Sequence, residues 1–234
     1  MKEIAQIRSL SFWIFLVPFV AINLCLLISV NDQIFDNTYF SVDMIGRSNF
    51  TFPYFDGGLS ISRASRTFPQ YLIFKPAMSV TSILLFFYWY KNNILINRFK
   101  NTKLKKNAFM IFGILSALFL LIHSILLGLE TDVKIFKFLK RVVLLSFIIF
   151  EIIAQSLLVV NFYKLKIELT NYLNLNILKL KILLVSTLIF IAIISIPLLI
   201  MSGNVHFKHG LEWNYFIGVI LFYLLTRFFW KKNF

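Results

Sequence analysis

The chain has 234 residues, of which 59% are hydrophobic and only 15% are charged, and its mean hydropathy is +0.81. A soluble domain carries about 25% charged residues, so this composition excludes an ordinary soluble domain and indicates a membrane protein. The formal charge of +14 suggests nucleic acid, but no nucleic-acid-binding motif is present and many basic residues lie in short loops beside apolar stretches. We therefore expect membrane lipids, and no nucleic acid, as partners.

Six apolar stretches are long enough, or nearly so, to cross a hydrocarbon core of about 30 Å at ~1.5 Å per helical residue. No small-residue cleavage site follows the first, so we expect a retained helix and not a signal peptide. The last is the shortest. The sequence predicts an all-α integral membrane protein, one domain over residues 1–234. Its spans are expected near residues 10–30, 71–90, 108–128, 142–163, 181–201 and 214–230.

The loops between these spans predict the orientation of the chain. Most of the 24 basic residues fall in the two tails and in the loops at 91–107 and 164–181, the second of which contains Lys181. Most of the 10 acidic residues fall on the opposite side. Because basic loops stay in the cytoplasm, we expect both termini to be cytoplasmic. The polar segment at 31–70 is then a long structured exoplasmic loop, and it includes a glycosylation sequon at Asn49.

The stretch FPYFDGGLSISRASRTFPQYLIFK, residues 52–75, combines turn-forming and charged residues in this loop. Asp-Gly and Gly-Gly supply positive φ for a turn, and Ser60 or Ser62 would cap a short helix after it. On that helix Arg63 and Arg66 would share a face. Two guanidiniums beside a helix N-terminus suit a phosphate, and the phosphate most available here is a lipid headgroup.

A structural role is the alternative, in which the arginines pair with Asp56 or Glu212 and only lock the loop. A Ser/His/Asp hydrolase site can also be assembled from these loops, but no G-x-S-x-G motif supports it, and catalysis is left open. The headgroup-binding candidates are the polar and interfacial residues of the exoplasmic segments: Asp56, Ser60, Ser62, Arg63, Arg66, Lys75, His206, His209, Glu212 and Trp213.

The sequence HFKHGLEW, which precedes the sixth span, offers two histidines at i, i+3 and a carboxylate three residues on. This spacing would suit a metal on a helix, but Gly210 interrupts it and no H-E-x-x-H motif is present. We therefore expect neither a metal nor another cofactor. The alternative role is that Glu212 and Trp213 anchor the start of the sixth span at the membrane interface.

Two ionisable side chains lie deep in the predicted spans, where such groups are costly. His123 in the third span and Glu151 in the fourth differ in depth by roughly 6 Å, so antiparallel helices would let them meet. Gln155 is four residues after Glu151, on the same face. They form either a polar site open to the exoplasmic leaflet or a hydrogen bond between helices. The inner halves of the spans are nearly free of ionisable groups, which disfavours a carrier or channel.

Six spans, cytoplasmic termini and a long first exoplasmic loop resemble the Frag1/DRAM/Sfk1 family. The family loop typically carries a Pro-aromatic-(Ile/Phe)-Ser/Asp-x-Gly element, then Pro and Ile/Leu-Phe at the start of span two. Here PYFDGGLSISRASRTFPQYLIF, residues 53–74, is similar, and Glu212-Trp213 is similar to a Glu-aromatic pair that begins a late span in the family. The resemblance implies a lipid context, because relatives are associated with lipid remodelling, phospholipid asymmetry, lipid-kinase regulation and lysosomal membranes in autophagy. It supplies no catalytic mechanism.

The expected function is therefore lipid handling or remodelling, with a phospholipid or glycolipid headgroup bound at the exoplasmic face. The alternatives are a membrane scaffold or regulator without catalysis, a membrane-embedded lipid hydrolase or acyltransferase, and a transporter.

Overall fold

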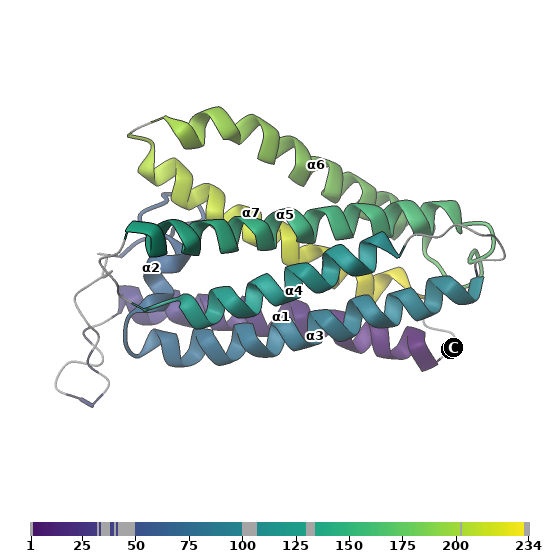
Figure 1. The fold of residues 1–234 in the computed structure, drawn as a ribbon, viewed down its shortest axis with the longest axis horizontal. Coiled ribbons are helices and arrows are strands. Elements are labelled where there is room, and N and C mark those ends of the chain that lie inside the picture. The colour runs from purple at the N-terminus through teal and green to yellow at the C-terminus, as the bar shows by residue number, and fades with distance from the viewer. Residues whose placement is uncertain are drawn as a thin grey trace.

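The computed structural model describes residues 2–31, 33, 38–39, 41, 50–99, 107–129, 134–201 and 203–231. The sequon at Asn49 and most of the segment before it lie outside the described residues. The described residues form helices and contain no strand. The helices are α1 (Lys2–Val30), α2 (Ile61–Arg66), α3 (Gln70–Phe99), α4 (Ala108–Leu126), α5 (Lys134–Lys164), α6 (Leu175–Ile200) and α7 (Val205–Phe229) (Figure 1).

The six long helices form an elongated bundle, and the short helix α2 lies at one end of it (Figure 1). In the bundle α1 packs on α3 and α7, α3 on α4, and α4 on α5. The helix α6 meets α5 and α7 toward the other end of the bundle and leans away from α5 toward the end that carries α2 (Figure 1). We call the end with α2 and residues 50–60 the α2 end, and the opposite one the termini end.

The two ends of the described chain lie together at the termini end. Arg98, in the last turn of α3, forms an ion pair with Glu3 at 2.7 Å. The Lys231 N–H donates to the Tyr172 carbonyl at 3.0 Å, and the Tyr172 ring lies 6.3 Å from that of Phe99. Both termini are thus on one side of the bundle, while their assignment to the cytoplasm stays a prediction.

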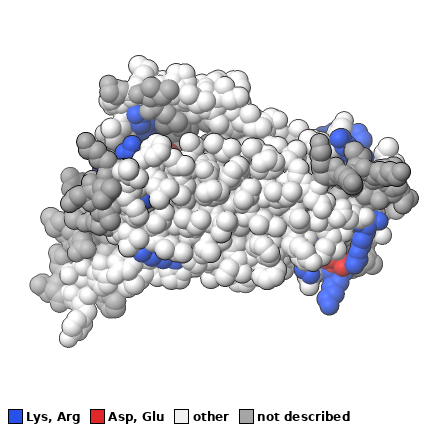
Figure 2. Space-filling model, in the orientation of Figure 1, with Lys and Arg blue, Asp and Glu red and all other residues white. Residues whose placement is uncertain are grey.

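Five helices are long and apolar enough to cross a membrane: α1, α3, α4, the Phe138–Lys164 part of α5, and the Leu175–Leu198 part of α6. Figure 2 shows charged side chains gathered at the two ends of the bundle, with an uncharged surface between them. These features fit an integral multi-pass membrane protein. The helix α7 is not among the five, so the predicted sixth span is not shown by length and composition.

The helix that contains the predicted sixth span begins before residue 214. The helix α7 begins at Val205 and continues through Gly210, so the HFKHGLEW segment lies on its first turns. A Cβ on Gly210 would lie 3.6 Å from the Pro53 carbonyl oxygen. This is an ordinary van der Waals distance, so the loop at 50–60 packs against this turn without requiring a glycine there, and Gly210 does not end the helix.

The assignment of Lys181 to a basic loop is wrong. The Asn174 side chain accepts hydrogen bonds from the N–H groups of Asn176 and Ile177, which starts α6 well before Lys181. Lys181 is fully buried, and its Nζ donates to Thr226 Oγ1 at 2.7 Å. The same Nζ lies 3.8 Å and 5.0 Å from two ring centroids of α7, those of Phe222 and Phe229. Lys181 is thus an ionisable residue at the inner end of a predicted span, in halves that the sequence shows to be nearly free of such groups.

Candidate functional site

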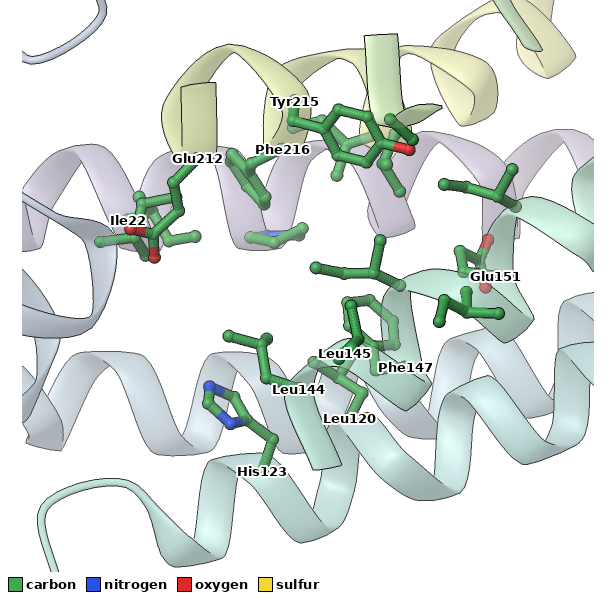
Figure 3. A pocket seen from close by; sticks show the side chains of 18 of the residues that line it. Ile22, Leu120, His123, Leu144, Leu145, Phe147, Glu151, Glu212, Tyr215 and Phe216 are labelled. Atoms are coloured by element: carbon green, nitrogen blue, oxygen red, sulfur yellow. The ribbon is translucent and has the colours of Figure 1, made fainter. Parts of the chain in front are cut away.

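A cavity of about 550 Å³ lies between the helices in the half of the bundle nearer the α2 end. This volume is within the roughly 300–1,000 Å³ range of ligand pockets. Every helix of the bundle contributes to its wall, and the wall is mostly apolar. Figure 3 shows the open interior between α4, α5 and α7, and representative apolar residues are Ile22, Phe74, Met78, Leu120, Leu145, Ile193 and Phe216.

Polar residues gather where the cavity reaches the α2 end. Lys208 and Glu212 are four residues apart on α7, and both line the cavity together with Ser62 of α2. Lys208 Nζ donates to the Met201 carbonyl at 2.9 Å. Burial raises the pKa of Glu212 to about 7, although hydrogen bonds from the backbone amides of Ser62 and Ile61 oppose that rise. The cavity therefore combines an apolar interior with a charged rim, which we define as Ser62, Lys208 and Glu212.

The loop at 50–60 holds this rim in place through Asp56. The Asp56 carboxylate accepts hydrogen bonds from Thr51 Oγ1 at 2.6 Å, from Phe52 N at 2.8 Å and from Gly58 N at 2.8 Å. Desolvation would raise the pKa of Asp56, but these donors outweigh it and the pKa is lowered. Asp56 therefore shapes the turn, and the donors that stabilise its negative charge all belong to the same loop.

Gly57 brings this turn into direct contact with α7. Its φ is +61°, and a Cβ at this position would lie 1.8 Å from the carbonyl oxygen of His206. His209 Nδ1 lies 3.0 Å from the Gly57 carbonyl oxygen. Burial lowers the pKa of His209, against the opposing effect of this hydrogen bond. Both candidate histidines therefore contribute to docking of the loop, His206 through its backbone and His209 through its ring.

Trp213 fixes the same loop from a second side. Its indole is fully buried, and Nε1 donates to the Leu59 carbonyl at 2.8 Å. Its ring meets that of Tyr54 edge to face at 4.9 Å between centroids. The Tyr54 hydroxyl in turn donates to Asn23 Oδ1 of α1 at 3.0 Å. Trp213 therefore links α1, the loop and α7 inside the protein, and its buried ring is not on the surface where the predicted anchor at the membrane interface would lie.

The predicted cap of the short helix is confirmed. Ser60 is the N-cap of α2, and its Oγ accepts from Arg63 N at 3.2 Å. The amides of Ile61 and Ser62 interact with the Glu212 carboxylate. Protein groups thus lie at the N-terminus of α2, and a phosphate at that helix terminus stays a prediction.

The other cationic candidates lie away from the cavity wall. Arg63 and Arg66 are exposed in the last turn of α2, and neither forms an ion pair with Asp56 or Glu212 among the described residues. Lys75 Nζ lies 5.5 Å from the Tyr71 ring centroid and does not line the cavity. The alternative in which the arginines lock the loop by ion pairs is thus not observed.

At the opposite end of the cavity, Glu151 is almost completely buried. Its carboxylate accepts hydrogen bonds from Ser116 Oγ at 2.6 Å, from Gln155 Nε2 at 3.0 Å and from the Tyr223 hydroxyl. Gln155 Nε2 also lies 3.2 Å from the Val219 carbonyl. The predicted shared face of Glu151 and Gln155 is confirmed. Glu151 therefore joins α4, α5 and α7, which corresponds to the structural alternative for this residue.

His123 does not form the predicted contact with Glu151. The two side chains line different parts of the cavity wall (Figure 3). His123 is 9% exposed, and its Nδ1 has no hydrogen-bond partner among the described residues. A buried polar atom without a partner costs about 1–3 kcal/mol, so this nitrogen is a marker for a ligand atom.

The elements of a hydrolase are not assembled among the described residues. His209 Nδ1 faces the Gly57 carbonyl, and Asp56 accepts from Thr51 and backbone amides. No hydrogen bond there joins Ser60 or Ser62 to a histidine; their hydroxyls lie 3.3 Å from each other. The described residues also contain no group of three or more His, Cys, Asp and Glu side chains that could hold a metal.

Sequence reasoning missed Lys208 and Tyr223. Lys208 lies within the HFKHGLEW segment, and its i, i+4 relation to Glu212 holds because α7 begins at Val205 and continues through Gly210. Tyr223 lies in an apolar helix where a tyrosine is ordinarily a packing or interface residue. Nothing local distinguishes it as the partner of Glu151.

Comparison of the sequence with protein-family models, with curated proteins and with solved structures finds no match in any of the three. The functional argument therefore rests on the cavity and the residues around it.

Glu212 is expected to make the stability of the protein depend on pH. Because its pKa is about 7 in the folded protein and about 4.3 in an unfolded chain, the folded state retains a proton that the unfolded state releases. The resulting stabilisation is complete below about pH 4 and is lost as the pH rises to about 7.

The thermal midpoint of the detergent-purified protein should therefore fall between about pH 5 and pH 8, and the fall should be smaller in Glu212→Gln. A difference between wild type and variant that stays constant over this range would contradict the assignment.

Proposed function

We propose that this chain is a lipid-handling membrane protein that binds a phospholipid or glycolipid with its acyl chain in the cavity and its headgroup at the charged rim. The observation that carries the proposal is the cavity itself, which is apolar along most of its wall and charged where it reaches the α2 end. A lipid has this same division between an apolar chain and a polar head.

The proposed topology places the rim on the exoplasmic side. With α7 as a sixth span, both termini are cytoplasmic and the α2 end faces out. The common location of Glu3 and Lys231 near the termini end supports an even number of crossings. In this arrangement the lipid enters from the outer leaflet.

Membership in the Frag1/DRAM/Sfk1 family is part of the same proposal. The two segments that carry the resemblance, residues 53–74 and Glu212-Trp213, lie in contact through the Leu59 carbonyl and the Trp213 indole. Both segments also reach the cavity wall, through Ser62 and Glu212 among others. The shared position of the two motifs supports a common role in forming the lipid site.

Filling the cavity should displace the lipid. Ala192 of α6 lines the cavity, whereas Ile194, two residues further on, is exposed on the outside of α6 and does not line it. We expect Ala192→Trp to reduce the lipid that copurifies with the full-length protein by roughly tenfold, a loss of about 1.4 kcal/mol in binding. Mass spectrometry of lipids extracted from the purified protein measures this quantity.

Ile194→Trp is the matched control, because it adds an indole to the same helix on the face directed away from the cavity. It should retain lipid at the wild-type level. Equal lipid content in Ala192→Trp and Ile194→Trp, or no lipid above the detergent background in the wild type, would contradict the proposal.

A further inference from the structure

The charged rim presents two opposite charges that do not pair with each other. Lys208 and Glu212 are at i, i+4 on α7, a spacing at which unlike charges commonly interact. Here Lys208 Nζ donates to the Met201 carbonyl, and the Glu212 carboxylate is directed to the amides of α2. No ion pair joins them among the described residues. Each charge is therefore free to meet a ligand group of the opposite sign.

Both groups retain hydrogen-bonding capacity after these contacts. An ammonium has three donors, and Lys208 uses one of them on Met201. A carboxylate offers about four acceptor positions, and Glu212 shares two of them with the amides of Ile61 and Ser62. A cation at Glu212 and an anion at Lys208 can therefore be added without displacing the protein contacts that hold the rim.

His123 faces the same part of the cavity from the opposite wall. Figure 3 shows the His123 ring of α4 and the Glu212 carboxylate of α7 near one end of the open space, with Glu151 near the other. His123 is about nine-tenths buried, and its Nδ1 has no hydrogen-bond partner among the described residues. An oxygen acceptor of the ligand would satisfy this nitrogen when it carries the proton.

We propose that the bound lipid is a phospholipid whose headgroup carries an ammonium group beside its phosphate. The ammonium meets the Glu212 carboxylate, the phosphate meets Lys208, and an ester or phosphate oxygen accepts from His123 Nδ1. An anionic headgroup without an ammonium would still pair its phosphate with Lys208, but it would leave the Glu212 carboxylate without a cation and beside a negative charge. The inference rests on the proposed function and names the ligand class of the same site.

Competition between headgroups tests the inference on the full-length protein in detergent micelles. The probe is phosphatidylethanolamine with a fluorescent acyl chain, displaced by unlabelled phosphatidylethanolamine, phosphatidylcholine or phosphatidylglycerol with identical chains, at about pH 8 where Glu212 is ionised. The two ammonium lipids should compete at roughly tenfold lower concentration than phosphatidylglycerol, which corresponds to about 1.4 kcal/mol. If phosphatidylethanolamine and phosphatidylcholine compete at different concentrations, the difference shows whether the site prefers a primary or a quaternary ammonium.

Three variants test the roles proposed for Glu212 and Lys208 in headgroup binding. Glu212→Gln keeps an acceptor for the α2 amides and should bind the probe, but the tenfold preference should fall to less than about threefold. Lys208→Gln should weaken all three lipids by similar factors because each contains the phosphate. Lys75→Gln, which changes a lysine outside the cavity wall, should match the wild type.

The outcomes separate the two proposals. If phosphatidylglycerol competes as well as the ammonium lipids, or if Glu212→Gln keeps the preference, the inference is overturned while the proposed lipid binding stands. If no lipid displaces the probe, the proposed function fails as well. Should Glu212→Gln not fold, the headgroup series on the wild-type protein decides the question.

Discussion

Replacing Glu151 with leucine is expected to destabilise the bundle by about 1–3 kcal/mol, because the buried Tyr223 hydroxyl loses its acceptor while Ser116 and Gln155 keep hydrogen bonds to the Gly113 and Val219 carbonyls. The Ser116 hydroxyl, the Gln155 amide and the Tyr223 hydroxyl all donate to this carboxylate. Leucine fills a similar volume and accepts from none of them. The thermal midpoint of the purified protein should fall sharply, and contacts of α5 with α4 and α7 should loosen together.

Glu151→Gln is the matched variant, because its amide oxygen still accepts hydrogen bonds at the same place. It should lose clearly less stability than Glu151→Leu, since at least one of the three donors keeps its partner. If the leucine variant is as stable as the glutamine variant, the hydrogen bonds at Glu151 are not what joins these helices.

Replacing Gly57 with alanine is expected to detach the loop at 50–60 from α7. The φ of +61° disfavours any L side chain, and the added Cβ would lie 1.8 Å from the His206 carbonyl oxygen, so backbone must move. Hydrogen exchange should rise in residues 51–60 and at the start of α7. Because Ser62 and Glu212 belong to the segments that this contact holds together, the affinity for lipid should also fall.

Gly203→Ala is the control for the backbone strain of a side chain at positive φ, without a clash against another part of the chain. Gly203 also has a positive φ, +94°, but no atom of the described part of the chain lies within 4 Å of a Cβ built there. The Gly203→Ala variant should lose only about 1 kcal/mol from local backbone strain, and hydrogen exchange in residues 51–60 should stay at the wild-type rate. Equal exchange in the two variants would mean that the contact between Gly57 and His206 does not hold the loop.

The parts of this protein that depend on local sequence are predicted well. Long apolar runs indicate most of the helices, and the Ser60 cap follows from residue types that act within a few positions. The shared face of Glu151 and Gln155 follows from helix geometry alone. Each of these features depends on residues a few positions apart and not on contacts with distant parts of the chain.

The parts that depend on distant packing are not predicted. The first turns of α7 pack against the loop at 50–60, which is more than one hundred positions away in the sequence, through contacts such as that of Trp213 with the Leu59 carbonyl. Lys181 is buried because rings on α7 surround its ammonium. The cavity is lined by residues from every helix of the bundle, so its position depends on how all of these helices pack and not on any one segment of the sequence.

The burial of Lys181 also determines the register between α6 and α7. Moving α6 by one residue would rotate its side chains by about 100°, since a helical turn contains 3.6 residues. The amino group would then leave Thr226 and its two aromatic rings and turn toward apolar side chains or lipid, a costly environment for a polar group without a hydrogen-bond partner. A single buried polar residue thus favours one alignment of α6 on α7.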